Sequence, residues 1–434
     1  MSHPRALVLG IDGVPFTLLE SLAQAGVMPV ISQLFSDGQS KPITSSIPDV
    51  SSTAWSSFMT GTNPGEHGIY GFFEVNPENY GLRFPTYGDL KAEPFWNQLS
   101  SRGFRSLVLN VPQTYPARQL DGILISGFVA PKLDRAVYPA ALLNELRDLD
   151  YRIDVDAWLA RSDPGKFFDD LFQVLRSRRK SIDHLWSKEA WDFVNVVFTG
   201  TDRLQHYFWH SITDPKDEFH QSAMDFYSEL DAIISDILEK VDEDCTVILL
   251  SDHGFTEIER EVNLNAWLRQ EGYLKFRSDN PEDLQDIHSD TLAFALDPGR
   301  IYMNLADRYK QGTVKSADAA SILQELKSKI ESGITIRDRA GNKVNPIANV
   351  YLPDEIYRGG SIDAAPDLIV QPVPGIDLKG SVKIQEISRS ERLTGCHTYE
   401  NASLVVKNET EDFAWDAIGS IQDIIPAIRP IYDL

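Results

Sequence analysis

Residues 47–73 read IPDVSSTAWSSFMTGTNPGEHGIYGFF, and the first half of this stretch has the spacing of a helix. Pro48 and Asp49 break regular structure before the predicted helix. Apolar residues then recur at helical intervals, and Gly61 ends the helical pattern. Hydroxyl side chains at the start of a helix lie where free backbone N–H groups and the helix dipole favour an anion. They suit a nucleophile that attacks a phosphoryl group, although a simple helix cap has the same composition.

The composition is that of a globular protein with an acidic surface. The chain has 434 residues, of which 42% are hydrophobic and 24% charged, and its formal net charge is −23. This charge repels nucleic acid backbones and anionic membranes, so a nucleic acid polymer is not expected as a partner. A small anionic substrate remains compatible with it if bound cations dominate the field of the site. The sequence leaves the oligomeric state open.

The cysteines and the apolar runs predict the compartment. Cys245 and Cys396 are far apart and lack metal-type spacing, which favours buried thiols in a reducing compartment. The N-terminal apolar run is too short for a signal peptide, and no stretch approaches the roughly 20 apolar residues of a membrane span. We therefore expect a cytoplasmic protein without a membrane span.

Buried strands alternate with helices along the chain. Short, continuous apolar runs of the kind found in parallel sheets occur at residues 5–11, 106–111, 193–199, 245–250 and 402–406. Amphipathic patterns between and after these runs predict helices, among them 219–241 and a closing helix at 414–425. The alternation predicts an α/β fold with a mostly parallel central sheet and helices on both faces.

The character of the sequence changes between residues 263 and 383. This part contains acidic loops, a short strand at 300–304, an amphipathic helix at 317–332 and a turn at 340–342. We predict that residues 263–383 form a small α+β cap inserted into the main domain. The catalytic core would then consist of residues 1–262 and 384–434.

Three of the predicted strands are followed closely by an acidic residue. Asp12 follows the first strand, Asp202 follows the strand at 193–199, and Asp252 follows the strand at 245–250. Because ligands collect at the carboxyl ends of parallel strands, we expect these carboxylates to share one edge of the sheet. Without a counter-charge they would repel one another strongly, and bound divalent metal is the simplest counter-charge.

Three histidines accompany these carboxylates. His206 is one helical turn after Asp202, His253 follows Asp252 directly, and His397 lies in the Gly-containing segment TGCHT. Imidazole nitrogens beside carboxylates suit zinc or a similar ion. Each histidine alone is as well explained by packing or by a loop position, so the prediction depends on the repetition.

Five motifs in this order resemble the alkaline phosphatase superfamily, and in particular its type I phosphodiesterase/nucleotide pyrophosphatase family. They are LVLGIDG, VSSTAWSSFMTGTNPGEHGI, TDRLQH, LLSDHGF and GCHT, and the resemblance extends from about residue 6 to residue 406. It implies the three-layer α/β sandwich of that superfamily. It also implies a metal-dependent hydrolase that acts on a small phosphate ester at a two-metal site.

Carried over position by position, the resemblance implies two divalent metal ions, with Zn²⁺ the usual choice of the family and Mn²⁺ an alternative. The residues implied for the first ion are Asp12, Ser51, Asp252 and His253. The residues implied for the second ion are Asp202, His206 and His397.

The resemblance also implies the nucleophile. In the family a Thr or Ser lies ten residues before the Gly of a Thr-Gly pair, and counting back from Gly61 gives Ser51. Ser52 and Thr53 are the neighbours that compete for this role. In-line attack on phosphorus would give a covalent phosphoryl-serine or nucleotidyl intermediate.

One departure leaves the substrate open. In nucleotide pyrophosphatases a polar Asn soon after the E-x-H-G-I segment contacts the phosphate, whereas Phe72 occupies the matching place here. A nucleotide substrate therefore does not follow from the resemblance. Phe72 and Tyr70 are candidate substrate contacts, and a place in the apolar core is the simpler interpretation of both.

Other functions are compatible with parts of the pattern. A phosphomonoesterase or a phosphonate or sulfate ester hydrolase would use the same metal pair, but residues 51–55 lack the C/S-x-P-x-R motif of sulfatases. A phosphoglycerate mutase would need a clearer set of basic residues. A phosphodiester needs less positive charge around it than a monoester, which favours a diesterase. A non-catalytic binding protein with the same fold is the alternative from another class, and the full set of proposed ligands argues against it.

Overall fold

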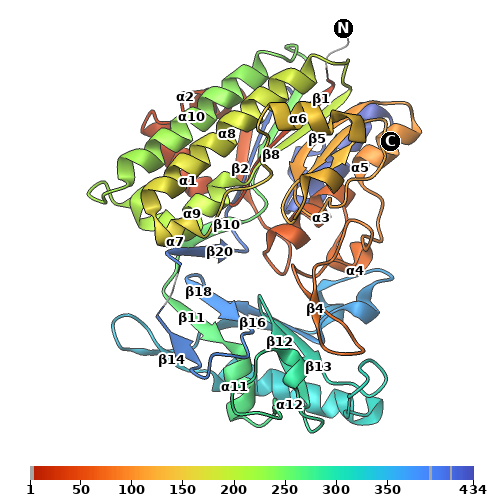
Figure 1. Cartoon of the computed structure of the whole chain (residues 1–434), viewed down its shortest axis with the longest axis vertical. Coiled ribbons are helices and arrows are strands. Elements are labelled where there is room, and N and C mark those ends of the chain that lie inside the picture. The colour runs from red at the N-terminus through yellow and green to blue at the C-terminus, as the bar shows by residue number, and fades with distance from the viewer. Residues whose placement is uncertain (1–3, 391–392, 411–412) are drawn as a thin grey trace. The chain divides into compact units, whose positions relative to one another are not determined.

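The computed structural model describes residues 4–390, 393–410 and 413–434 (Figure 1). The chain divides into two compact units. The first unit comprises residues 1–62, 86–255 and 397–434, and the second comprises residues 63–85 and 256–396. The predicted insertion at 263–383 lies inside the longer segment of the second unit, and the proposal that it is a separate cap domain stays a prediction.

The first unit is built on an eight-stranded sheet with the strand order β2-β21-β9-β1-β8-β5-β6-β7. The five parallel strands at its centre are β9 (Thr246–Leu250), β1 (Ala6–Ile11), β8 (Phe193–Phe198), β5 (Ser106–Val111) and β6 (Gly122–Ser126). The antiparallel strands at the two edges are β2 (Gln39–Ile43), β21 (Ala402–Lys407) and β7 (Val137–Tyr138). The predicted mostly parallel sheet is confirmed.

Helices cover both faces of this sheet, because its central strands are apolar on both sides (Figure 1). Along β1, Leu7 and Leu9 belong to one apolar core, while Ala6 and Val8 belong to another. The helices that contribute to the first core are α1 (Phe16–Gln24), α2 (Pro29–Asp37), α6 (Leu143–Asp148), α7 (Leu159–Ser162), α8 (Pro164–Trp186), α9 (Gly200–Thr213) and α10 (His220–Leu238). Those that contribute to the second core are α3 (Ser51–Thr60), α5 (Phe95–Ser101) and α14 (Ile424–Ile428). The α/β sandwich expected from the sequence is thus present.

The predicted closing helix at 414–425 is wrong. The structure has two short 3-10 helices and α14 in this region, the 3-10 helices at Trp415–Ala417 and Ile421–Asp423. The carboxylate of Asp423 accepts hydrogen bonds from the backbone N–H groups of Gly419 and Ser420. A side chain that bonds these N–H groups competes with the helical pattern and ends it at this point.

The second unit has its own apolar core. Its four-stranded sheet has the order β12-β13-β17-β16, and its three-stranded sheet has the order β18-β11-β19. These strands are β12 (Ala293–Leu296), β13 (Arg300–Met303), β17 (Leu368–Pro372), β16 (Ile347–Tyr351), β18 (Ile376–Lys379), β11 (Arg260–Asn263) and β19 (Ser388–Arg389). The helices of its core are α11 (Leu264–Gln270) and α12 (Ser316–Gly333). Residues 63–85 add α4 (Pro64–His67), β3 (Glu74–Val75) and β4 (Leu82–Arg83).

In the part of the chain that the structure describes, no single helix has the length and apolar content of a membrane span. The bent pair α1 and α2 meets those criteria only when its two helices are taken together, with an angle of 109° between them. Leu19 and Leu22 of α1 and Ile31 of α2 are buried in the first core.

Gly10 in β1 provides room for the indole ring of Trp55 in α3. A methyl group at position 10 would lie 2.5 Å from Trp55 Cη2 and 2.9 Å from Val197 Cγ2. We expect Gly10→Ala to lower the free energy of unfolding by about 1–3 kcal/mol, because the well-packed core cannot accommodate the extra atom without moving. Urea denaturation followed by circular dichroism measures this change.

The matched control is Gly165→Ala in α8. The nearest atom to a methyl group at position 165 would be Asp163 Oδ1 at 3.7 Å, which is an ordinary contact. No loss of stability is expected there, because alanine also favours the helix. An equal loss in both variants would contradict the steric explanation.

Candidate active site

The three predicted carboxylates meet because β9, β1 and β8 are neighbours in the sheet. Asp12 follows β1, Asp202 lies in the first turn of α9 directly after β8, and Asp252 comes two residues after β9. Their exposed fractions are 2%, 4% and 0%, respectively. The carboxyl ends of adjacent parallel strands therefore bring three acidic groups together away from water.

One oxygen of each carboxylate accepts a hydrogen bond from an N–H donor. The donor–acceptor pairs are Trp55 Nε1 to Asp12 Oδ2 (3.0 Å), Arg203 Nη1 to Asp202 Oδ2 (3.1 Å) and Gly13 N to Asp252 Oδ1 (3.0 Å). Because the two oxygens of a carboxylate are rigidly linked, fixing one of them by a hydrogen bond also fixes the position of the other. Each of the second oxygens lies within 4.0 Å of a histidine nitrogen.

His253 lies at the centre of this arrangement and is fully buried. The distances from its Nε2 atom are 3.4 Å to Asp252 Oδ2, 3.7 Å to Asp12 Oδ1 and 4.0 Å to Asp202 Oδ1. One imidazole nitrogen thus faces oxygens from all three strand ends.

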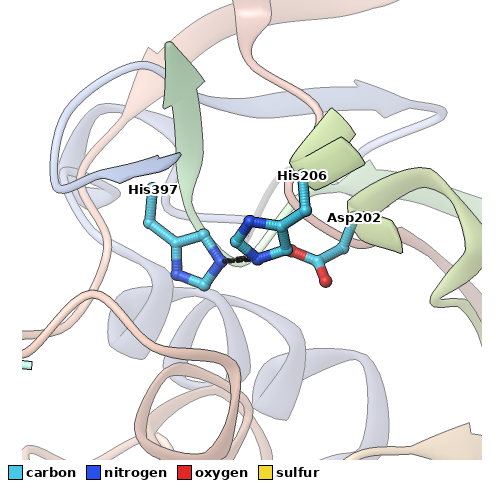
Figure 2. Close-up of side chains that lie close together, drawn as sticks. All are labelled: Asp202, His206 and His397. Atoms are coloured by element: carbon cyan, nitrogen blue, oxygen red, sulfur yellow. Dashed lines mark hydrogen bonds and ion pairs between the residues drawn. The ribbon is translucent and has the colours of Figure 1, made fainter. Parts of the chain in front are cut away.

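Asp202, His206 and His397 form a second close group, shown in Figure 2. Asp202 Oδ1 lies 3.1 Å from His397 Nε2 and 3.4 Å from His206 Nε2, and the two Nε2 atoms are 3.0 Å apart. His206 is one turn after Asp202 on α9, as the spacing predicted, and His397 lies on β20 (Gly395–Thr398). Two nitrogens and an oxygen at such distances fit around a single cation.

Backbone carbonyls hold the far nitrogens of two of these histidines. Nδ1 of His397 lies 2.8 Å from the carbonyl oxygen of Asp49, and Nδ1 of His253 lies 3.1 Å from that of Gly254. A carbonyl can only accept, so Nδ1 carries the proton and Nε2 of the neutral ring keeps its lone pair. This is the tautomer that a metal ligand needs.

Ser51 is the first residue of α3 and lies against both acidic and imidazole groups. Its Oγ is 3.4 Å from Asp12 Oδ1 and 3.3 Å from His253 Nε2. Within the described residues, no side chain caps α3 at Val50, so the helix begins with N–H groups that can bind an anion. The hydroxyls of Ser52 and Thr53 are buried and make no hydrogen bond to any described residue. The structure therefore brings Ser51, rather than its neighbours, to the carboxylates.

The buried carboxylates are difficult to ionise together. Burial raises the pKa of Asp12 well above its usual range, and the charges of Asp252 and Asp202 raise it further. Burial also raises the pKa of Asp252 to about 7, again with a contribution from the charge of Asp202. A bound cation would favour the charged forms of both groups.

The other members of the group respond to the charge of Asp202. Burial opposes ionisation of Asp202, but His206, His397 and Arg203 lower its pKa overall. Burial likewise opposes protonation of His397, and its hydrogen bond to Asp202 raises the pKa nevertheless. Burial and the neighbouring charge of His397 lower the pKa of His253. Asp202 is therefore the carboxylate that stays ionised.

The donor set fits divalent metal ions. Oδ2 of Asp252 is buried and has no hydrogen-bond partner among the described residues. A buried carboxylate oxygen without a partner is costly in free energy, and a cation would satisfy it. Besides the three residues in Figure 2, Asp12, Asp202 and His253 have ligand atoms close enough together to share an ion.

Comparison with protein families decides the assignment. Residues 6–400 match the sequence model of the family described as type I phosphodiesterase/nucleotide pyrophosphatase. The chain belongs to this family. Members of the family are phosphoric ester hydrolases of the alkaline phosphatase superfamily, which is metal-dependent with two-metal sites. A search of curated proteins gives no match.

Solved structures share the fold of this phosphodiesterase family member at low sequence identity. Phosphonoacetate hydrolase from Sinorhizobium meliloti in complex with phosphonoacetate has a TM-score of 0.66 at 15% identity, with 99% of this chain and 96% of that one covered. An inactive variant of murine ectonucleotide pyrophosphatase/phosphodiesterase 5 in complex with AMP has a TM-score of 0.59 at 13% identity, with coverage of 99% and 95%. Alkaline phosphatase PafA has a TM-score of 0.61 at 13% identity, with coverage of 100% and 96%. At these identities the likeness concerns the fold.

The sequence did not reveal which groups of this phosphodiesterase family member hydrogen-bond the predicted metal-ligating side chains and fix their orientation. Trp55 is fully buried, as expected of a core aromatic, yet its indole N–H also bonds Asp12. Its position one helical turn after Ser51 was the available signal. The carbonyl of Asp49 acts through the backbone, which leaves no signal in the side chain.

Tyr70 and Phe72, the predicted substrate contacts, belong to the second unit. The hydroxyl of Tyr70 donates a 2.7 Å hydrogen bond to the carbonyl oxygen of Ser361, and its ring centre lies 5.4 Å from that of Tyr357. Phe72 is half-buried. A role of either residue in substrate binding stays a prediction.

Asp252→Asn is expected to have opposite effects with and without metal. In excess chelator the variant should be at least as stable as the wild type, because it removes a buried carboxylate but keeps the acceptor for Gly13 N. With zinc at 100 times its dissociation constant, the wild type should gain about 2.7 kcal/mol of unfolding free energy and the variant less. Urea denaturation in the two conditions measures both quantities.

Asp231→Asn is the control, because Asp231 is a buried carboxylate outside the site. Its two oxygens accept hydrogen bonds from the backbone N–H groups of Val30 and Ile31 at the start of α2. Its substitution should cost the same stability with and without zinc. A gain from zinc in Asp252→Asn equal to that in the wild type would contradict the role of Asp252 as a metal ligand.

Proposed function

We propose that the chain is a metal-dependent phosphodiesterase that uses Ser51 as its nucleophile. The observation that carries this proposal is the position of Ser51 Oγ at the start of α3, 3.4 Å from Asp12 Oδ1 and 3.3 Å from His253 Nε2. Membership of the phosphodiesterase family supports the reaction class. The murine relative described as inactive carries a threonine-to-alanine change, which supports a hydroxyl nucleophile in this fold.

The proposed metal ions are two divalent cations, most simply Zn²⁺, with Mn²⁺ as the alternative. The residues proposed for the first site are Asp12, Ser51, Asp252 and His253. Those proposed for the second site are Asp202, His206 and His397. When bound, such ions lower the pKa of a coordinated hydroxyl and offset the charge on the phosphoryl oxygens.

The proposed reaction has two steps, and Ser51 takes part in both. Ser51 Oγ attacks phosphorus in line, its proton passes to solvent, and the bond from phosphorus to the leaving alcohol breaks. A water molecule then attacks the phosphorus of the serine ester, and Ser51 regains a proton as the product leaves. No side chain caps α3 at Val50, so its first N–H groups could bind the phosphoryl oxygens of an ester on Ser51.

A diester is the proposed substrate class because it carries one negative charge and needs less positive charge around it than a monoester does. The guanidinium of Arg203 already pairs with Asp202 and Asp154. Its charge is therefore offset before any substrate binds. The proposed partner is a small phosphate ester rather than a nucleic acid polymer, which the net charge of −23 supports. A cytoplasmic location is proposed on the low cysteine content.

Phosphonate hydrolysis is the second candidate, favoured by the fold shared with phosphonoacetate hydrolase. The experiment that separates the two compares three substrates: bis-p-nitrophenyl phosphate, p-nitrophenyl phosphate and phosphonoacetate. We expect the diester to be hydrolysed fastest and its turnover to disappear with chelator and return with Zn²⁺ or Mn²⁺. Faster turnover of phosphonoacetate than of the diester would replace the proposed substrate class.

Ser51→Ala is expected to lower kcat for the diester on the order of 10⁴-fold, because the nucleophile is lost. Ser52→Ala is the matched control and should keep most of the activity, since the Ser52 hydroxyl makes no hydrogen bond to any described residue. Mass spectrometry of acid-quenched wild-type enzyme should find the covalent adduct on the peptide that contains Ser51. Loss of activity in Ser52→Ala together with normal turnover in Ser51→Ala would move the nucleophile.

A further inference from the structure

Arg203 joins the candidate metal site to a segment that the sequence did not connect with it. Its side chain is only 16% exposed, and all three guanidinium nitrogens donate hydrogen bonds. Nη1 donates to Asp202 Oδ2 at 3.1 Å, while Nε and Nη2 donate to Asp154 Oδ2 at 3.1 and 2.8 Å. Its guanidinium carbon lies 4.2 Å from the ring centre of Phe128, a cation–π distance. Arg203 is thus fixed on several sides.

The segment that carries Asp154 is itself held in place. Arg178 of α8 is 2% exposed, and its Nη2 donates to the backbone carbonyls of Arg152 and Ile153 at 3.2 and 2.9 Å. The guanidinium of Arg152 pairs with the carboxylate of Asp170, also on α8. Because these contacts all lie within the first unit, Asp154 has a fixed position from which to hold Arg203.

The contact matters because Asp202 Oδ1 is the oxygen that faces the histidines, at 3.1 Å from His397 Nε2, 3.4 Å from His206 Nε2 and 4.0 Å from His253 Nε2. Two rotatable bonds set the direction of an aspartate carboxylate, and a donor on Oδ2 restricts both of them. With Oδ2 bound to Arg203, Oδ1 is directed toward Nε2 of His206 and His397. A free Asp202 could turn either oxygen toward the histidines or toward solvent.

We propose that Arg203 and Asp154 form a clamp that positions Asp202 as a metal ligand. This inference rests on the metal site proposed above. Neither residue is placed against the reacting atoms, so both are positioning residues that act through Asp202. Such partners of ligands typically contribute about 10–100-fold to metal affinity. The predicted motif TDRLQH includes Arg203, whereas Asp154 lies outside all five motifs.

The test uses the metal-stripped full-length chain and three variants. Arg203→Met removes the donors, Arg203→Lys keeps the charge but lacks the planar guanidinium that donates from three nitrogens, and Asp154→Asn removes one of the two carboxylate partners of Arg203 while leaving Asp202 unchanged. Zinc affinity is measured by competition with a chromophoric chelator, and the visible spectrum of the cobalt-loaded protein reports the ligand geometry. We expect Asp154→Asn and Arg203→Lys to weaken one of the two zinc sites about 10-fold and Arg203→Met up to about 100-fold, with an altered cobalt spectrum.

Arg147→Met is the matched control, because Arg147 pairs with Asp134 in an exposed ion pair. It should leave zinc affinity and the cobalt spectrum unchanged. If Arg203→Met fails to fold, Asp154→Asn carries the test, since it keeps the pair between Arg203 and Asp202.

The outcomes separate the clamp from the proposed function. A wild type that binds no zinc would overturn the proposed metal site and the clamp with it. Zinc affinities in Asp154→Asn and Arg203→Lys equal to that of the wild type would overturn the clamp and leave the proposed metal site standing. At saturating zinc, a raised KM for the diester in Asp154→Asn with unchanged zinc affinity would assign Arg203 to substrate binding instead.

Discussion

Repulsion among three carboxylates is the constraint around which this active site is built. Because β9, β1 and β8 are adjacent and parallel, Asp252, Asp12 and Asp202 must end at the same edge of the sheet. Burial then removes the water that would screen their charges. The raised pKa values of Asp12 and Asp252 express this conflict within the protein. Bound cations would relieve this repulsion, because metal binding favours the ionised form of its ligands.

Hydrogen bonds from the protein itself fix the orientation of the three carboxylates. Each has one oxygen on a donor of a different chemical kind: an indole, a guanidinium and a backbone amide. These donors leave the opposite oxygens for the shared centre, while backbone carbonyls set the tautomers of His253 and His397. Ligands held in place before the metal arrives need little reorganisation when it binds. An acidic surface is compatible with an anionic substrate if bound cations dominate the local field.

Family membership and fold do not by themselves choose the substrate. Proteins with this fold include a phosphonoacetate hydrolase, a nucleotide pyrophosphatase and an alkaline phosphatase, all at identities of 15% or less. The candidate catalytic residues of this chain lie at strand ends and at the start of α3, and a shared fold does not define which substrate they act on. The second unit, with residues 63–85 and 256–396, carries the aromatic side chains predicted to contact substrate.

The sequence by itself determined the strands, the acidic residue after each of three of them, and the pairing of Asp202 with His206 one turn later. These features depend on local apolar runs and helical spacing, which are visible within a few residues. Only the tertiary structure decided that those three strands are neighbours, which oxygen of each carboxylate is held, and that Asp154 reaches Asp202 through Arg203. It also decided that residues 63–85 join the second unit and that the end of the chain is not one helix. Such features depend on contacts between residues far apart in the chain, and no local pattern encodes them.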